Sequence, residues 1–151
     1  MILEALKALG IEASLFGDEP TTEAEYQERV KPANGAALPP WAEVEPKLAE
    51  AQRAERLAGV RAEAKRRMIV LTGARDAAHL DILISNGNRE AIRLLRKGAE
   101  NWTAEEAARA AALEQFDEGI EAIRAASNAL EPMDPIPADF TADNHWPEGT
   151  S

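Results

Sequence analysis

The 151-residue chain contains no cysteine, which excludes disulfide bonds, thiolate metal ligands and a cysteine nucleophile. Aromatic residues make up only 5% of the sequence, and alanine supplies much of its 45% hydrophobic content. Alanine favours helices but buries little apolar area per residue. The composition therefore predicts a thin helical core whose stability depends on self-association or on a partner.

Long apolar runs are also missing. No stretch approaches the roughly 20 apolar residues that span a membrane. The first ten residues, MILEALKALG, lack the basic start and the apolar stretch of a signal peptide. We therefore expect synthesis in the cytoplasm and no membrane partner.

Residues suited to catalysis are scarce. There are two histidines, and His79, beside Leu80 on an expected helix, is interpreted as structural. The acids around His145 match no established cation-binding loop. The sequence also lacks a glycine-rich phosphate loop and a nucleophile elbow. These observations predict neither an enzyme nor a cofactor, and they leave a hydrolase or metal enzyme as a minor alternative.

The net charge of −10 is unevenly distributed. Residues 1–50 carry −6, residues 51–100 carry +5, and residues 101–151 carry −9. The acidic ends either pack against the basic middle of the same molecule or pair with it between subunits. Nucleic acid is disfavoured as a partner, because the acidic flanks repel phosphates from the basic stretch.

Hydrophobic spacing predicts a short amphipathic helix over residues 2–9 that ends at Gly10. Residues 10–40 read as irregular. Within them, Thr22 and Glu25 have the spacing of a capping box for a turn of helix at 23–30. The alternative is an extended arm that ends at Pro32.

The central part of the chain predicts helices broken by turns. The main helix is expected from about Pro46, because proline lacks the amide that an interior turn uses, to about Leu71 or Thr72. Residues 41–45 are expected to form a preceding turn. Its polar face carries ion pairs such as Glu63 with Arg67. A second helix is expected over 74–85, an Asn-Gly-Asn turn at 86–88, and a basic helix over 89–97.

The clearest predicted element begins at Thr103, because Thr103 and Glu106 form a capping box at the start of an apolar pattern. The apolar positions then alternate in steps of three and four, as in a coiled-coil seam that is weakened by Ser127. An ordinary amphipathic helix on its own core is the alternative. The candidate interaction seam consists of Leu113, Phe116, Ile120, Ile123 and Leu130.

After Leu130 the chain changes character. Four prolines prevent the helix from continuing, and the acidic segment 132–151 holds three bulky side chains, those of Ile136, Phe140 and Trp146. The segment is either a disordered end or an arm that docks on a neighbour through these anchors. The aromatic anchors favour docking, because a purely solvating tail has no use for them.

These patterns together predict an all-α protein, an elongated helical bundle or hairpin with one long central helix and a long C-terminal helix. An extended N-terminal arm precedes the helices, and a proline-rich tail follows them. The expected segments are 1–40, 41–131 and 132–151.

Two stretches resemble known phage proteins. The stretch from Glu25-Tyr26 to Leu38-Pro39-Pro40-Trp41-Ala42-Glu43 resembles small proteins encoded beside tail-fibre genes of tailed bacteriophages. The C-terminal third, with its acidic helix start, its Phe116 and its final Trp146-Pro147, resembles tail fibre assembly proteins. At the aromatic position this chain has Phe116 between acids, where the assembly family carries a Trp…Tyr-Arg run.

The resemblance implies a protein of a phage tail module that acts by binding a tail fibre or baseplate protein. It implies synthesis in the bacterial cytoplasm and a place in the virion tail, with self-association expected from the seam. A structural component is the first expectation. An assembly chaperone that leaves the finished particle is the second.

Overall fold

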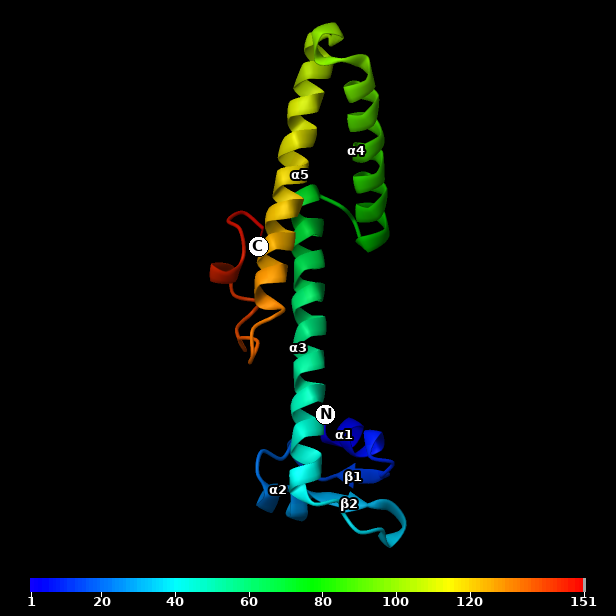
Figure 1. Ribbon diagram of the computed structural model, residues 1–151, viewed down its shortest axis with the longest axis vertical. Helices are drawn as coiled ribbons and strands as arrows, with labels where there is room; N and C mark the ends of the chain where they lie inside the picture. Colours follow the sequence, from blue (N-terminus) through cyan, green and yellow to red (C-terminus); the bar gives the residue numbers. More distant parts are fainter. Residues whose placement is uncertain (151) are drawn as a thin grey trace. The chain divides into compact units, whose positions relative to one another are not determined.

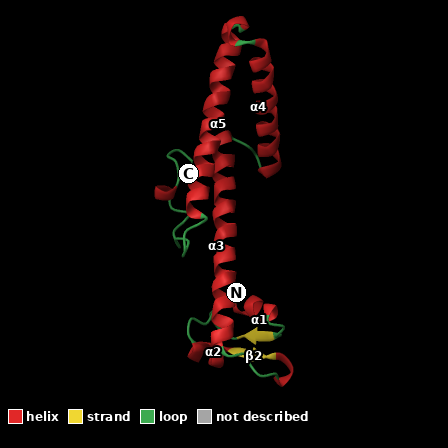
Figure 2. Ribbon diagram, in the orientation of Figure 1, coloured by secondary structure: helices red, strands yellow, loops and turns green. Residues whose placement is uncertain are grey.

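The computed structural model describes residues 1–150, apart from the side chain of Asn34. The chain is mostly helical, with 68% helix and 4% strand, which confirms the predicted helical class (Figures 1 and 2). Its residues form two compact units, which meet inside helix α3 (Trp41–Thr72) between Leu57 and Ala58. The expected division into segments 1–40, 41–131 and 132–151 stays a prediction. No described helix has both the length and the apolar character of a membrane span.

The N-terminal unit is more ordered than the sequence indicated. The strands pair antiparallel, with Leu15 opposite Val30, and neither strand was predicted. The expectation of an extended arm is therefore wrong for residues 10–32, and the capped-helix alternative is correct. The elements are α1 (Ile2–Ala8), β1 (Ala13–Leu15), α2 (Glu23–Arg29), β2 (Val30–Pro32) and a 3-10 turn (Ala33–Gly35).

The start of α2 differs in one detail from the predicted capping box. The Thr22 hydroxyl accepts from the Glu25 amide at 3.3 Å, as expected. The Glu25 carboxylate instead accepts from the amide and hydroxyl of Thr21, each at 2.8 Å. The Thr21 hydrogen bonds are the main reason that the pKa of Glu25 is lowered.

The core of this unit brings α1, α2, β2 and the start of α3 together. Tyr26 is fully buried, and its hydroxyl donates to the Pro39 carbonyl at 3.1 Å. Its ring lies 5.4 Å from the Trp41 ring. The buried members of the core are Ile2, Ala5, Leu6, Tyr26, Val30, Val44 and Leu48.

Helix α3 begins five residues before the predicted start. The amides of Glu43 and Val44 donate to the Pro40 carbonyl, which closes the first turn. Pro46 lies inside the helix. It removes one backbone hydrogen bond, but the turn around it places Val44 and Leu48 on one face, and both are buried in the core. Burial of this face outweighs the lost bond.

Helix α4 (Ala77–Lys97) runs without a break through the Asn-Gly-Asn segment, so the predicted turn at 86–88 is wrong. Gly87 is unfavourable within a helix by about 1 kcal/mol relative to alanine. A continuous helix, however, keeps Leu80 and Leu94 buried on one side. A Cβ at Gly87 would lie 3.4 Å from the Leu113 side chain, so α4 packs closely against α5 here.

Helix α5 (Ala104–Leu130) begins as predicted. The Thr103 hydroxyl accepts from the Glu106 amide at 3.2 Å, and the Glu106 carboxylate accepts from the Thr103 amide at 2.9 Å. Gly98, at a φ of +83°, ends α4 before a short 3-10 turn (Ala99–Asn101). Helices α4 and α5 therefore lie antiparallel beside each other in the second unit (Figure 1).

The C-terminal segment follows α5 as loops and one 3-10 turn (Asp143–His145) and lies beside α3 and α5 (Figure 2). Ile136 is 1% exposed and Trp146 is 6% exposed. A Cβ at Gly59 of α3 would lie only 2.6 Å from the tip of the Phe140 ring. All three predicted anchors therefore pack within their own chain in this structure.

Candidate functional site

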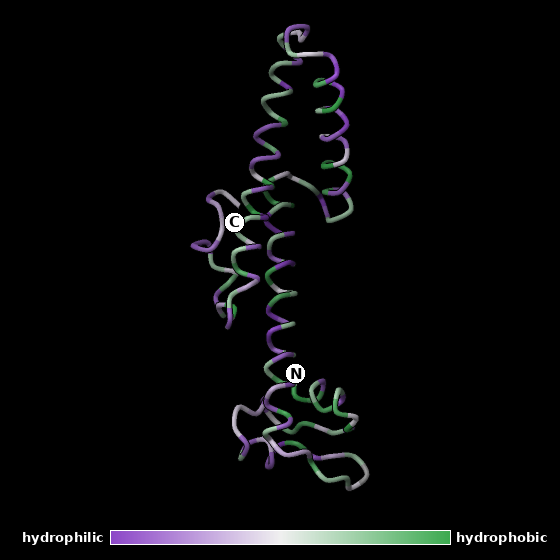
Figure 3. The backbone as a smooth tube through the Cα atoms, in the orientation of Figure 1, coloured by the Kyte–Doolittle hydropathy of each residue, from purple (hydrophilic) through white to green (hydrophobic). Residues whose placement is uncertain are grey.

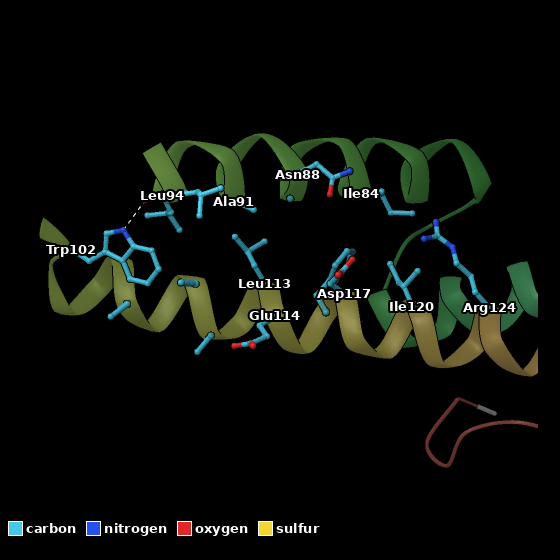
Figure 4. A pocket seen from close by; sticks show the side chains of 16 residues that line it. Ile84, Asn88, Ala91, Leu94, Trp102, Leu113, Glu114, Asp117, Ile120 and Arg124 are labelled. Atoms are coloured by element: carbon cyan, nitrogen blue, oxygen red, sulfur yellow. Dashed lines mark hydrogen bonds between the residues drawn. The ribbon is translucent and has the colours of Figure 1, made fainter. Parts of the chain in front are cut away.

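The main candidate site is an open groove between α4 and α5 with a volume of about 640 Å³. Leu94 and Ile84 of α4 point toward Leu113 and Ile120 of α5 across the gap (Figure 4). Hydrophobic and hydrophilic residues alternate along both helices (Figure 3). The wall is mainly apolar, and its further apolar lining residues are Gly87, Ala91, Leu95, Trp102, Ala107, Ala110, Ala111 and Phe116.

The groove is closed at one end by Trp102. The indole Nε1 donates to the Leu94 carbonyl at 2.9 Å, which holds the ring over the end of α4 (Figure 4). Trp102 directly precedes the Thr103 cap, and Ala107 lies four residues beyond the cap. An apolar pair at these two positions is a hydrophobic staple. The staple fixes the angle at which the chain enters α5 and so shapes the end of the groove.

One edge of the groove is closed by ion pairs between the helices. Lys97 Nζ lies 2.6 Å from the Glu106 carboxylate, and Arg93 contacts the same group at 3.2 Å. Arg109 contacts Glu90 at 3.1 Å. These contacts fix the antiparallel register of α4 and α5.

The same contacts shift the titration of both acids. Hydrogen bonds from Arg93 and then Arg109 lower the pKa of Glu90 to about 2. A hydrogen bond from Lys97, followed by one from the Thr103 amide, lowers the pKa of Glu106 to about 2. Both carboxylates therefore stay ionised throughout the neutral range.

The opposite edge is open and amphipathic. Leu95 lines the groove and is 79% exposed, and the neighbouring Ile92 is 50% exposed. On α5 the acids Glu114 and Asp117 line the groove, exposed and outside every ion pair found among the described residues. Leu95 and Ile92 are therefore apolar side chains that stay in water beside the apolar wall of the groove.

The structure divides the predicted seam into two parts. Ile120, Ile123 and Leu130 are buried within their own chain, as is Ser127. Leu113 and Phe116 are half-buried and line the groove, which Ile120 also reaches. The role of the seam in association therefore stays a prediction. The seam residues that remain partly exposed lie in the first half of α5.

Sequence reasoning missed the α4 wall of the groove, because it placed a turn at 86–88. The spacing of Leu80, Ile84, Ala91 and Leu94 is that of one continuous helical face and was the available signal. Trp102 was also missed, although its place before the capping box marks a staple.

A buried polar cluster holds the C-terminal segment on α3. Arg67 lies on the predicted polar face of the helix and pairs with Glu63 as expected, but it is only 1% exposed. Its guanidinium donates to Glu63 at 2.7 Å, to Asp143 at 2.8 Å and to the Thr141 carbonyl at 2.9 Å. Arg66 and, more weakly, Arg67 lower the pKa of Glu63. The cluster joins the basic middle to the acidic end within one molecule.

The described residues offer no cluster of three or more histidine, aspartate or glutamate side chains arranged to hold a metal ion. His145 contacts Asp139 at 3.3 Å, and His79 accepts from the Arg75 amide at 3.1 Å. Comparison of the chain with protein-family models, curated proteins and solved structures finds no match.

Proposed function

We propose that this chain is an accessory protein of a bacteriophage tail that acts by binding other proteins through the α4/α5 groove. The observation that carries the binding role is the apolar wall with its exposed Leu95. The groove has the form that receives an amphipathic helix, since it is flanked by helices and lined by small and aliphatic side chains. The tail assignment rests on the resemblance of residues 25–43 and of the C-terminal third to phage tail proteins.

Binding is favoured over catalysis by the content of the groove. Its polar lining residues are Asn88, Glu114, Asp117 and Arg124. No histidine and no hydroxyl or amine nucleophile is among them. Binding of nucleic acid is disfavoured, because Arg93, Lys97 and Arg67 of the basic middle are engaged by carboxylates.

In the first form of this proposal the protein is a structural component of the tail fibre or baseplate region. The expected helical bundle is then completed between chains at the groove. The C-terminal segment, which ends in Trp146-Pro147, supports an alternative in which the protein is an assembly chaperone and is absent from the particle.

Mass spectrometry of purified virions separates the two forms, since only the structural component is retained. The role of the groove is tested with Leu95→Glu, which places a charge on the wall without disturbing a buried contact. Ile82→Glu is the matched control, because Ile82 is 55% exposed on the same helix and does not line the groove. We expect Leu95→Glu to abolish tail association or fibre assembly and Ile82→Glu to preserve it. Equal behaviour of the two variants would remove the groove from the proposal.

A further inference from the structure

We infer that the occupant of the α4/α5 groove is an amphipathic helix of another protein that carries an apolar stripe and, along one flank, lysine or arginine. The inference rests on the proposed function, because it names the chemistry of the partner at the same groove. The apolar wall selects a helix with an apolar stripe, and the charges along the open edge select the sign of its flank.

The α4 side of the open edge carries an acid, an amide and a leucine. Asp81, Asn88 and Leu95 recur every seven residues and therefore share one side of the helix. All three are exposed, and Asn88 and Leu95 line the groove. The charge on this side of the edge is therefore negative.

The four bases of α4 lie on its other sides. Arg93 and Lys97 contact Glu106 across the closed edge. Arg89 and Arg96 each lie two residues beyond a residue that faces α5, which places them on the opposite side of the helix. None of the four offsets the negative charge of the open edge.

The α5 side of the open edge is acidic. Ala107, Ala111, Glu114 and Glu118 recur at spacings of three and four and share one side of this helix. Glu114 and the neighbouring Asp117 line the groove (Figure 4). The three carboxylates are exposed, and none forms an ion pair with another described residue.

The groove has one base among its described lining residues, and that base is engaged. Arg124 lies at the end away from Trp102 and pairs with Glu121 of its own helix (Figure 4). An occupant therefore meets a negative edge. Such an edge repels phosphates, acidic lipid headgroups and acidic helices, and it attracts a basic flank.

The dimensions of the groove suit a helix of about five turns. The lining residues of α5 extend from Ala107 to Arg124, about 26 Å along the helix axis. Leu95 and Ile92 would leave water against the apolar stripe of the occupant. The alanines of α5 beside them have small side chains, which permit close approach of a third helix.

The test measures the binding of three synthetic peptides of about 18 residues to the full-length protein by isothermal titration calorimetry. The first carries leucines at helical spacing and lysines along one flank. The second has glutamate in place of each lysine. The third has the composition of the first in an order without helical periodicity. We expect the lysine peptide to bind at least about tenfold more tightly than either of the others, and salt to weaken its binding.

Charge reversal on α5 identifies the acids that select the flank. In Glu114→Lys/Asp117→Lys/Glu118→Lys the open edge becomes positive. All three positions are exposed, so the variant keeps its fold, which circular dichroism verifies. We expect the preference to invert, so that the glutamate peptide binds more tightly than the lysine peptide.

The control variant has the same net charge but a native groove. Glu12→Lys/Glu28→Lys/Glu45→Lys changes three exposed acids of the N-terminal unit that lie outside the groove. We expect this variant to keep the wild-type preference for the lysine peptide.

The apolar contact is tested with an uncharged pair of variants. Leu95→Gln removes the exposed leucine of the wall, and we expect it to weaken binding of the lysine peptide at least about tenfold. Ile82→Gln is the matched control on the same helix, because Ile82 is exposed but does not line the groove. We expect its binding to be unchanged.

Three outcomes overturn the inference. In the first, the lysine peptide binds no more tightly than the glutamate peptide or the aperiodic peptide. In the second, the reversed variant and its control show the same preference. In the third, analytical ultracentrifugation finds a wild-type dimer that Leu95→Gln dissociates, so that a second copy is the occupant.

The failure of this inference differs from the failure of the proposed function. If Leu95→Glu still abolishes tail association, the proposed function stands and the groove takes an occupant of another chemistry. If Leu95→Glu behaves as Ile82→Glu does, the groove loses its proposed function as well.

Discussion

The guanidinium of Arg67 lies over the ring of Trp146, 5.2 Å from the ring centroid. The two residues are separated by slightly more than half the chain, and both are almost fully buried. The contact adds a cation–π attraction to the hydrogen bonds that Arg67 donates to Glu63, Asp143 and Thr141. It is the central attachment of the C-terminal segment to α3.

Replacement of Arg67 by methionine tests this attachment. Methionine has a similar volume but leaves Glu63 as a charge that is 9% exposed and has lost one of its two partners. Breaking a buried pair costs about 3–5 kcal/mol, and the exposure of Asp143 favours the low end. Urea unfolding followed by tryptophan fluorescence measures the loss. Arg66→Met is the control, and its smaller loss follows from the 48% exposure of Arg66. Equal losses would contradict the attachment role.

The effect of Gly59→Ala depends on residue 140. Alanine normally stabilises a helix interior by about 1 kcal/mol relative to glycine. Here its Cβ would meet the Phe140 ring at 2.6 Å, so the ring must move and lose its contacts. We expect Gly59→Ala to destabilise the wild-type protein and to stabilise the Phe140→Ala variant. A double-mutant cycle from denaturant midpoints checks the change of sign. The same sign in both backgrounds would show that the ring has room to turn away.

The capping box at Thr103 contributes to the start of α5. Thr103→Ala removes a hydroxyl acceptor from the Glu106 amide, and we expect a loss of about 1 kcal/mol in the free energy of unfolding. Thr103→Ser retains the acceptor and serves as the control. Thermal unfolding measured by circular dichroism reports both. An unchanged midpoint in the alanine variant would mean that the ion pairs of Glu106 alone hold this turn.

The ion-paired edge of the groove predicts a defined pH dependence. The pKa values of Glu90 and Glu106 are about 2 in the folded chain, below the ordinary value of 4.5. Their contribution to stability is therefore complete above about pH 4.5 and is lost as the pH falls toward 2. Salt weakens this contribution to stability, because the ion pairs of both acids lie at the surface.

The variant Glu90→Gln/Glu106→Gln isolates this dependence from that of the other acids. We expect the stability difference between wild type and variant to be constant at neutral pH and to shrink between about pH 4.5 and 2. Helix content and unfolding midpoints measured at several pH values give the difference. A difference that does not vary with pH would contradict the assignment of the shifts to these two acids.

The sequence by itself determined those features whose cause is local. The capping box at Thr103, the end of the basic helix at residue 97 and the helical class depend on neighbouring side chains and on backbone preferences. The heptad-like spacing likewise placed Ile120 and Ile123 on a buried face.

The tertiary structure decided the features in which distant contacts oppose a local preference. Packing against α5 kept α4 helical through Gly87, and the N-terminal core drew the start of α3 back to Trp41 across Pro46. Contacts with the C-terminal segment buried Arg67 beneath Trp146 on the polar face of α3. The pairing of α4 with α5 also formed the groove, because its lining side chains come from both helices.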